Sequence, residues 1–184
     1  MERLWRGIVY IATSADGYIA RPDGGIGWLT EPDTSIQHAG EVAGPGIRTA
    51  YDDMIARVDA LIMGRRTYEK VLTFDEWPYP IPVIVLSKTL PEIADDRASV
   101  VRSLAEAVDA ANAMDAKGVY VDGGQTIQTF LRADLIDEIT VTRAPVLIGS
   151  GFPLFGELDQ DVKLRLEHVE SQDGYLMARY QVVR

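Results

Sequence analysis

Short apolar runs recur along the chain and predict buried strands. Residues 4–13 form the first strand-like stretch, and residues 58–64, 81–87 and 118–124 each hold a short, continuous apolar run. Continuous runs are typical of strands that are covered on both faces, as in a parallel sheet. A further strand is predicted at residues 137–147. This part of the pattern favours a mostly parallel sheet.

Helical periodicity separates these runs. Apolar residues recur every three or four positions in residues 44–58, 103–118 and 124–134. Within the second stretch, Ser103 and Glu106 have the spacing of a capping box. The side chains expected to face inward are, in the first stretch, Ile47, Tyr51, Met54 and Ile55; in the second, Leu104, Val108, Ala111 and Met114; and in the third, Ile127, Phe130 and Leu131. Gly118 is expected to end the second helix.

The last third of the chain changes to an alternating pattern. Residues 163–169 and 175–183 flank Asp173 and Gly174, which predict a tight turn and therefore an antiparallel hairpin. Strands that alternate with helices and end in a hairpin indicate an α/β fold. We predict a mostly parallel central sheet with an antiparallel C-terminal edge hairpin and flanking helices. No repeat or long linker divides the chain, so residues 1–184 are expected to form one domain.

Composition excludes several classes of site. The chain has 184 residues, no cysteine and two histidines that lie far apart, His38 and His168. Disulfides, thiolate metal sites and a cysteine nucleophile are therefore impossible, and we predict no metal site. A formal net charge of −10 argues against nucleic acid or an anionic membrane as a partner. No signal peptide or membrane span is recognisable, so we expect a cytoplasmic protein.

A local basic cluster follows one of the predicted strands. In "DALIMGRRTYEKV" (59–71) the apolar run ends at Gly64, and Arg65, Arg66 and Thr67 open a helical pattern. Ligands of parallel sheets bind at the carboxyl ends of strands. Arginine side chains bind phosphate oxygens in a bidentate manner, and a threonine hydroxyl donates to phosphate or caps a helix. The cluster therefore suits a phosphate ligand, although a helix cap with solvated arginines explains it as well.

Two other strand ends carry similar residues. The run in "VIVLSKT" (83–89) ends in hydroxyl and basic side chains, and the run in "VYVDGGQTI" (119–127) ends in paired glycines that open a helix. Taken singly, the first also fits a strand-to-turn transition and the second fits close packing of strand and helix. Recurrence at equivalent positions favours a ligand with several phosphates, such as a dinucleotide. The residues concerned are Ser87, Lys88 and Thr89, then Gly123, Gly124, Gln125 and Thr126.

Two stretches lack periodicity and predict long loops. Residues 15–46 and 148–160 are rich in glycine, and loops of this length are usually functional or mobile. The first loop carries Trp28 and several carboxylates, among them Asp33, and we expect it to cover a site. A carboxylate there could protonate a substrate nitrogen. Asp33 also fits a helix cap, and Trp28 also fits a loop anchor.

On these motifs the chain resembles the dihydrofolate reductase-like superfamily. Within it, the chain is similar to the reductase domain of bifunctional riboflavin-biosynthesis deaminase-reductases and their stand-alone relatives. The segments that carry the resemblance are "IATSADGYIARPDGGIGWL" (11–29), "DALIMGRRTYE" (59–69), "PVIVLSKT" (82–89) and residues 121–155. The last is the most specific, because a glycine pair, a helix, "LIDEI" and the turn "PVLIGSGFPLF" follow in the family's order.

The resemblance implies NADPH as cofactor. Its 2′-phosphate requires cations, which favours NADPH over NADH. By analogy with the family, Gly64, Arg65 and Thr67 face the phosphates, with Arg66 beside them; Ser87 and Lys88 face the 2′-phosphate; Gly123, Gly124, Gln125 and Thr126 hold the pyrophosphate; and Ala12 and Ile19 flank the nicotinamide.

The resemblance leaves the substrate open between two classes. Folate-reducing members carry an acidic residue shortly after the loop tryptophan, and Asp33 has the matching spacing of five from Trp28. Riboflavin-type members bind a ribosylaminopyrimidine phosphate through more basic loops than this one, which offers Arg21. We therefore expect a general stand-alone reductase of a small nitrogen heterocycle, with Asp33 and Trp28 as candidate catalytic residues. The resemblance also implies a homodimer.

Two other function classes compete with this interpretation. A binding module that keeps the nucleotide site without turnover, acting as a sensor or scaffold, would show the same strand-end motifs. A Rossmann-type oxidoreductase is disfavoured, because the G-x-G-x-x-G fingerprint after the first strand is absent.

Overall fold

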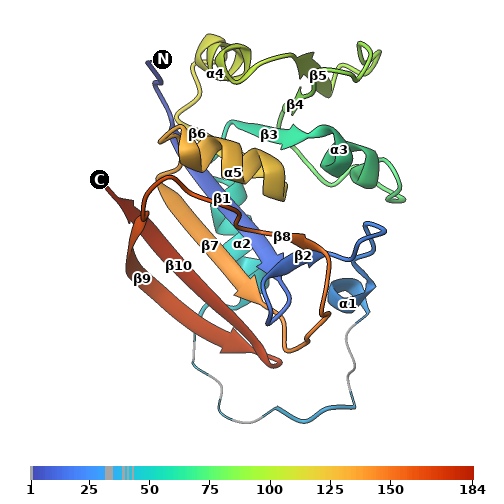
Figure 1. Cartoon of the computed structure of the whole chain (residues 1–184), viewed down its shortest axis with the longest axis vertical. Helices are drawn as coiled ribbons and strands as arrows, with labels where there is room; N and C mark the ends of the chain where they lie inside the picture. The colour runs from blue at the N-terminus through green and yellow to red at the C-terminus, as the bar shows by residue number, and fades with distance from the viewer. Residues whose placement is uncertain (1, 32–34, 39, 41, 43) are drawn as a thin grey trace.

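The structure, a computed structural model, describes residues 2–31, 35–38, 40, 42 and 44–184. Within these residues the chain forms one eight-stranded sheet, a separate strand pair and five helices (Figure 1). The strands are β1 (Arg6–Thr13), β2 (Tyr18–Ala20), β3 (Ala60–Gly64), β4 (Val83–Leu86), β5 (Ala98–Val101), β6 (Gly118–Asp122), β7 (Glu138–Arg143), β8 (Phe152–Pro153), β9 (Lys163–Gln172) and β10 (Tyr175–Val183). The helices are α1 (Gly27–Thr30), α2 (Ile47–Ile55), α3 (Arg65–Val71), α4 (Leu104–Ala113) and α5 (Gly124–Arg132).

The main sheet has the order β5-β4-β3-β6-β1-β7-β10-β9. Strands β5 to β7 in this order run parallel to one another, whereas β10 pairs antiparallel with β7 and β9 antiparallel with β10. The predicted α/β fold with an antiparallel C-terminal hairpin is therefore confirmed. Asp173 and Gly174 form its turn with φ of 51° and 78°, the left-handed conformation that a two-residue hairpin turn requires.

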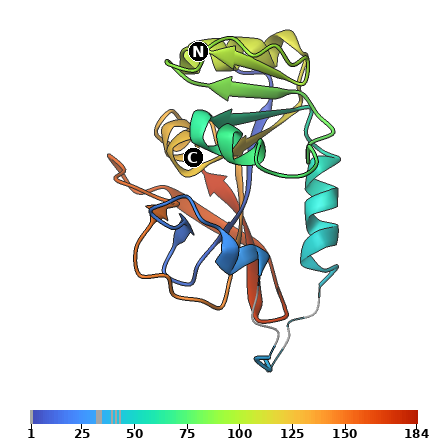
Figure 2. The ribbon, with the colours of Figure 1, turned by 90° about the vertical axis from the view of Figure 1, so that its right-hand side faces the viewer.

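Helices cover both faces of the parallel strands (Figures 1 and 2). Side chains alternate along each strand, so Ala60 and Ile62 of β3 join a core with α4 and α5. Leu61 and Met63 point the other way, into a core with α2 and α3. The continuous apolar runs of the sequence reflect this double cover.

The predicted helices are confirmed in their middles and corrected at one end. Ser103 accepts a hydrogen bond from the Glu106 N–H at 3.2 Å, as the capping box predicts. The helix ends at Ala113, however, and Met114 is 43% exposed, so the predicted inward position of Met114 is wrong. Gly118 is not the helix stop, because it begins β6. A Cβ at Gly118 would lie 2.1 Å from the Arg57 carbonyl oxygen, so the glycine permits a close backbone approach.

The sequence pattern did not predict four short elements of the structure. Strand β5 pairs with β4 at the parallel edge, and its four residues show no distinctive run. Helix α1 and strands β2 and β8 lie inside the stretches predicted as loops. Strands β2 and β8 pair with each other across more than 130 residues of sequence, and no local pattern can indicate such a pairing.

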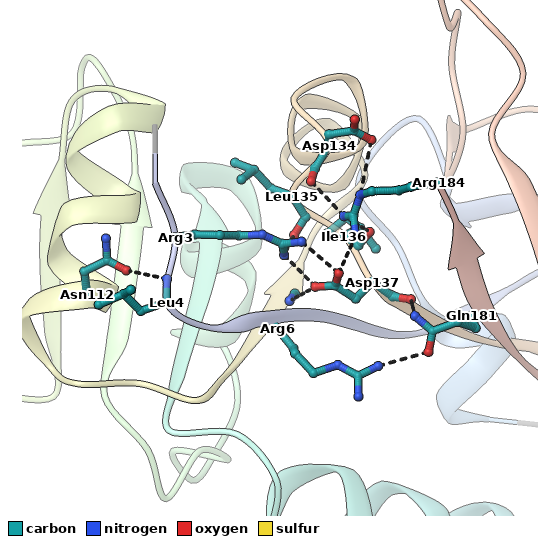
Figure 3. Close-up of polar contacts among 11 residues, drawn as sticks. Arg3, Leu4, Arg6, Asn112, Asp134, Leu135, Ile136, Asp137, Gln181 and Arg184 are labelled. Atoms are coloured by element: carbon teal, nitrogen blue, oxygen red, sulfur yellow. Dashed lines mark hydrogen bonds and ion pairs between the residues drawn. The ribbon is translucent and has the colours of Figure 1, made fainter.

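The amino end of the sheet is closed by a hub around Asp137 (Figure 3). Arg3 donates to both carboxylate oxygens of Asp137, at 2.5 and 2.7 Å, and Arg184 donates at 2.8 Å. The Gly7 N–H donates to the same carboxylate at 2.8 Å. Burial raises the pKa of Asp137, but the hydrogen bonds from Arg3 and Arg184 outweigh it, so the pKa is lowered. The hub joins both chain ends to the centre of the sheet.

Candidate cofactor and substrate site

The carboxyl ends of β3 and β6 form a topological switch point of the sheet. The two strands are parallel neighbours, yet α3, which follows β3, packs on one face, and α5, which follows β6, packs on the other. Open α/β sheets bind ligands in the crevice where neighbouring connections diverge in this way. Gly64 and Gly123 lie at this crevice, as the strand-end motifs predicted.

The two turns at the crevice interlock through glycines and threonines. A Cβ at Gly64 would lie 2.9 Å from the Thr126 hydroxyl, and a Cβ at Gly123 would lie 2.3 Å from the Thr67 hydroxyl. Gly123 also has φ of 87°, which disfavours any other residue. Thr67 therefore does not cap α3, whose N-terminus has no side-chain cap among the described residues. Thr126 is 5% exposed, so its hydroxyl lies between the turns.

Helix α5 presents uncapped donors to the crevice. Its N-cap is Gly123, and no described side chain accepts a hydrogen bond from its first turn. The first N–H groups of a helix lack partners within the helix, so those of Gly124, Gln125 and Thr126 suit an anion. The uncapped N-terminus of this nine-residue helix and the arginines of the neighbouring turn supply the donors that a pyrophosphate requires, while Gly64 and Gly123 let the two turns pack closely. The residues present therefore fit a dinucleotide.

The third predicted strand end forms a compact turn beside Arg65. Ser87 is 8% exposed, and its hydroxyl oxygen accepts from the Thr89 N–H at 3.3 Å and the Leu90 N–H at 3.0 Å. Arg65 donates to the Thr89 hydroxyl at 3.1 Å and to Glu69 at 2.6 Å. Lys88 is exposed on this turn. The turn thus brings two cations together where a 2′-phosphate was predicted.

A cation that the sequence patterns did not single out supports the same turn. Arg102, at the end of β5, donates to the carbonyl oxygen of Ser87 at 2.9 Å and to that of Leu90. Its other terminal nitrogen donates to Glu92 at 2.9 Å. The sequence offered little evidence for a role of Arg102, because this residue follows β5, a strand that the apolar pattern did not predict.

Strands β2 and β8 cover the glycine pair. A Cβ at Gly124 would lie 3.0 Å from both the Ile19 Cδ1 and the Pro153 carbonyl oxygen. Ile19 of β2 is therefore next to the start of α5, as its predicted contact with the cofactor requires. Ala12 lies on β1, where it pairs with Thr142 of β7 and is half-buried. The roles of both residues toward nicotinamide stay predictions.

Asp122 is the functional candidate that sequence reasoning missed. It is the last residue of β6, directly before the glycine pair, and its carboxylate accepts the Gly123 N–H at 2.7 Å. No described arginine, lysine or histidine pairs with it. Burial raises its pKa to about 6, and this hydrogen bond offsets only part of the rise. The sequence feature that could have identified it is the acidic residue in "VDGG". This motif looks like the end of any strand, so it did not single out Asp122.

Tyrosines surround Asp122 on the α2 face. Burial raises the pKa of Tyr51, Tyr79 and Tyr120, and the charge of Asp122 adds to each rise. Tyr10 on the neighbouring strand donates to the Ile47 carbonyl at 2.8 Å, and burial raises its pKa to about 12. All four phenols therefore stay protonated near neutral pH. A carboxyl group among neutral phenols is equipped to hold a proton and donate it.

Of the two predicted catalytic residues the structure describes only Trp28, and its catalytic role also stays a prediction. Trp28 lies in α1 and is 9% exposed, and its indole N–H has no hydrogen-bond partner among the described residues. Asp33 lies outside the described residues, so its role stays a prediction.

Metal-binding and membrane-spanning features are both missing from the described part of the chain. Its residues contain no group of three or more His, Asp or Glu side chains arranged to hold a metal ion. None of its helices has the length and apolar character to cross a bilayer.

With this geometry established, comparison with known proteins identifies the family. The model of the RibD C-terminal domain matches residues 6–176. The chain belongs to the RibD C-terminal domain family. The predicted resemblance to stand-alone relatives of the riboflavin-type reductase domain is thereby confirmed.

Individual relatives agree with this assignment. The chain is 36% identical over 172 residues to the uncharacterized protein YwjB of Bacillus subtilis (strain 168), an alignment that covers 91% of each chain. It is 40% identical to a protein of Shewanella sp. PV-4 named for riboflavin biosynthesis, with a TM-score of 0.82 over 97% of this chain and 99% of that one. A pyrimidine reductase-like protein of Corynebacterium diphtheriae shares the fold at 18% identity, with a TM-score of 0.68 over 97% and 92% of the two chains.

Proposed function

We propose that this member of the RibD C-terminal domain family is an NADPH-dependent reductase of a small nitrogen heterocycle. The observation that carries the proposal is the switch-point crevice, where the uncapped N-terminus of α5 lies beside the turn that carries Arg65 and Arg66. Bound NADPH would supply a hydride. A ribosylaminopyrimidine precursor of riboflavin is the favoured substrate because of the family, and a pterin is the alternative.

In this proposal, Asp122 provides the proton that the reduction requires. Saturating a carbon–nitrogen double bond adds a hydride to carbon and a proton to nitrogen. Side chains alternate along β6, so Asp122 faces the same side as Tyr120, the α2 side, and on β1 Ala12 faces the side of Tyr10. Asp122 therefore lies near the strand predicted to contact nicotinamide. A pKa of about 6 suits a general acid near neutral pH.

Cofactor binding is the first test. NADPH and NADH are titrated separately while tryptophan fluorescence is followed, with the wild-type chain, Arg65→Ala and Arg165→Ala. The two arginines are matched, since both are exposed and bonded to a neighbouring glutamate, at 2.6 and 2.8 Å. We expect tight NADPH binding, weak NADH binding and a loss of about tenfold or more in Arg65→Ala alone. Failure of both nucleotides to bind would reject the reductase.

Turnover separates the enzyme from the non-catalytic binding module. Oxidation of NADPH is measured with a ribosylaminopyrimidine phosphate and with dihydrofolate. Oxidation that depends on either substrate establishes the enzyme and names the substrate class. Binding of NADPH without turnover on both would favour the sensor or scaffold.

The homodimer stays a prediction. Three leucines of the C-terminal hairpin are exposed: Leu164 by 42%, Leu166 by 56% and Leu176 by 42%. Their side chains provide apolar surface for a second copy of the chain. Light scattering at micromolar concentration should give twice the chain mass. Leu166→Lys should lower it, whereas Leu72→Lys, at an exposed leucine elsewhere, should not.

A further inference from the structure

The turn "PVLIGSGFPLF" (145–155), part of the most family-specific stretch of the sequence, has no ligand role in the site described above. Two residues in its second half form β8, which pairs with β2. In this pairing Pro153 lies opposite Tyr18, and Phe152 lies opposite Ala20. The Leu154 N–H donates to the Gly17 carbonyl at 3.0 Å, and the Leu154 side chain is buried. The motif is therefore anchored to the segment that follows β1.

The same segment is fixed against the start of α5. The Gln128 side-chain amide donates to the carbonyl oxygens of Pro153 and Leu154, at 3.3 and 3.1 Å. The Pro153 carbonyl also lies 3.0 Å from the position that a Cβ would take at Gly124. Phe152 is thus held in a hydrogen-bonded strand pair beside the N-terminus of α5.

Phe152 faces a cation from the other turn of the crevice. The Arg66 guanidinium carbon lies 5.2 Å from the centre of the Phe152 ring, within the range of a cation–π contact. Among the described residues, Arg66 makes no hydrogen bond or ion pair. Arg65 differs, because Glu69 and Thr89 each already accept a hydrogen bond from its guanidinium group. Stacking on a ring uses none of the five N–H donors of a guanidinium, so Arg66 keeps all of them for an anion.

We propose that Phe152 is a positioning residue that holds Arg66 near the N-terminus of α5 for the pyrophosphate of the dinucleotide. This inference rests on the proposed function. A solvated arginine loses rotamer freedom when it binds an anion, and that loss weakens binding. A ring that already restrains the side chain reduces the loss. The motif therefore contributes to affinity without touching the ligand.

The test compares two ligands in four variants. NADPH and adenosine 2′-monophosphate, which lacks the pyrophosphate, are titrated against wild type, Phe152→Leu, Phe152→Tyr, Arg66→Gln and the double variant Phe152→Leu/Arg66→Gln. We expect NADPH binding to weaken about fivefold in Phe152→Leu and about tenfold in Arg66→Gln. Phe152→Tyr should stay within about twofold of wild type, because tyrosine keeps the ring. Phe155→Leu, at an exposed phenylalanine of the same segment, serves as control.

Coupling between the two positions decides the outcome. Phe152→Leu should cause no further loss in the Arg66→Gln background, and adenosine 2′-monophosphate should bind all variants equally. Independent losses, or equal losses for both ligands, would overturn the inference while leaving the reductase intact. If wild type and Arg66→Gln bind NADPH with the same affinity, the inference is also overturned. This comparison holds even if Phe152→Leu fails to fold. If wild type binds no NADPH, the proposed function fails and this inference fails with it.

Discussion

Asp137, which is buried, and Asp122, which is partly buried, lie at opposite ends of the sheet and have opposite surroundings. Asp137, just before β7 at the amino end, is bonded to Arg3, Arg184 and the Gly7 N–H, and its pKa is lowered. Asp122, at the carboxyl end of β6, pairs with no described cation, and its pKa is raised to about 6. Burial acts on both carboxyl groups in the same direction. The hydrogen bonds from the two arginines and from the Gly7 N–H reverse the result at Asp137.

The difference separates a structural group from a group available for chemistry. An ion pair with two arginines fixes Asp137 as a carboxylate and joins the two chain ends (Figure 3). Asp122 has no such partner among the described residues, so it keeps its proton to a higher pH than an ordinary carboxyl group and titrates closer to neutral pH. Uncompensated burial of this kind is typical of functional sites. The same contrast should appear in variants of the two residues.

Removing the Asp122 carboxyl group should have the largest effect. Asp122→Asn keeps the shape and the acceptor for the Gly123 N–H but removes the acid. We expect the rate of substrate-dependent NADPH oxidation to fall by about a hundredfold or more, with NADPH affinity nearly unchanged. In wild type, kcat/KM should fall as the pH rises above about 6. An Asp122→Asn rate close to wild type would remove Asp122 from the chemistry.

Removing Asp137 should affect stability and leave the site intact. Asp137→Ala strands Arg3 and Arg184 without their partner, and we expect the free energy of unfolding to fall by about 3 kcal/mol. Asp134→Asn is the matched control, because Asp134 also faces Arg184, at 3.7 Å, but is 77% exposed, and asparagine tolerates the left-handed φ of 60° at this position. It should cost less than about 0.5 kcal/mol. Urea denaturation measures both, and equal losses would contradict the hub.

The pH dependence of stability should separate the two groups. The raised pKa of Asp122 favours the fold below its ordinary value of 3.8, and this contribution is lost as the pH rises through about 6. Asp122→Asn should therefore be more stable than wild type at pH 8, by up to about 3 kcal/mol, and nearly equal at pH 4. The lowered pKa of Asp137 acts in reverse, because its contribution is lost as the pH falls. Denaturation at both pH values tests this, and a difference between Asp122→Asn and wild type that stays constant with pH would count against it.

Two helix N-termini at the carboxyl end of the sheet provide the smallest test. Ser103 caps α4, whereas α5 has Gly123 at its N-cap position and no side-chain cap from the described residues. Ser103→Ala should lower the free energy of unfolding by about 1 kcal/mol and leave NADPH binding unchanged. A loss of NADPH affinity in this variant would show that α4, and not α5 alone, forms part of the site.

Local patterns predicted most of the fold because burial on both faces leaves a clear signature. Continuous apolar runs located β1, β3, β4 and β6, and helical spacing located α2, α4 and α5. The strand-end motifs pointed to the crevice, since the carboxyl ends of parallel strands meet at one edge of the sheet. Their contacts with a ligand stay predictions.

Long-range pairings could not be predicted in the same way. The pairing of β2 with β8 and the contact between Arg66 and Phe152 join segments that are distant in sequence. Asp122 was missed for the same reason. Its sequence neighbours are those of any strand end, and its raised pKa depends on the burial that α2 and other segments provide once they pack over it.

The sequence by itself therefore determined the α/β architecture, the terminal hairpin and the edge of the sheet where ligands are expected to bind. These follow from periodicity and turn chemistry, which act over a few residues. The tertiary structure alone decided which arginines are already paired with an acid, which carboxyl group has no cationic partner among the described residues, and which aromatic ring faces Arg66. Those properties depend on burial and on distances between remote segments, and they exist only once the chain has folded.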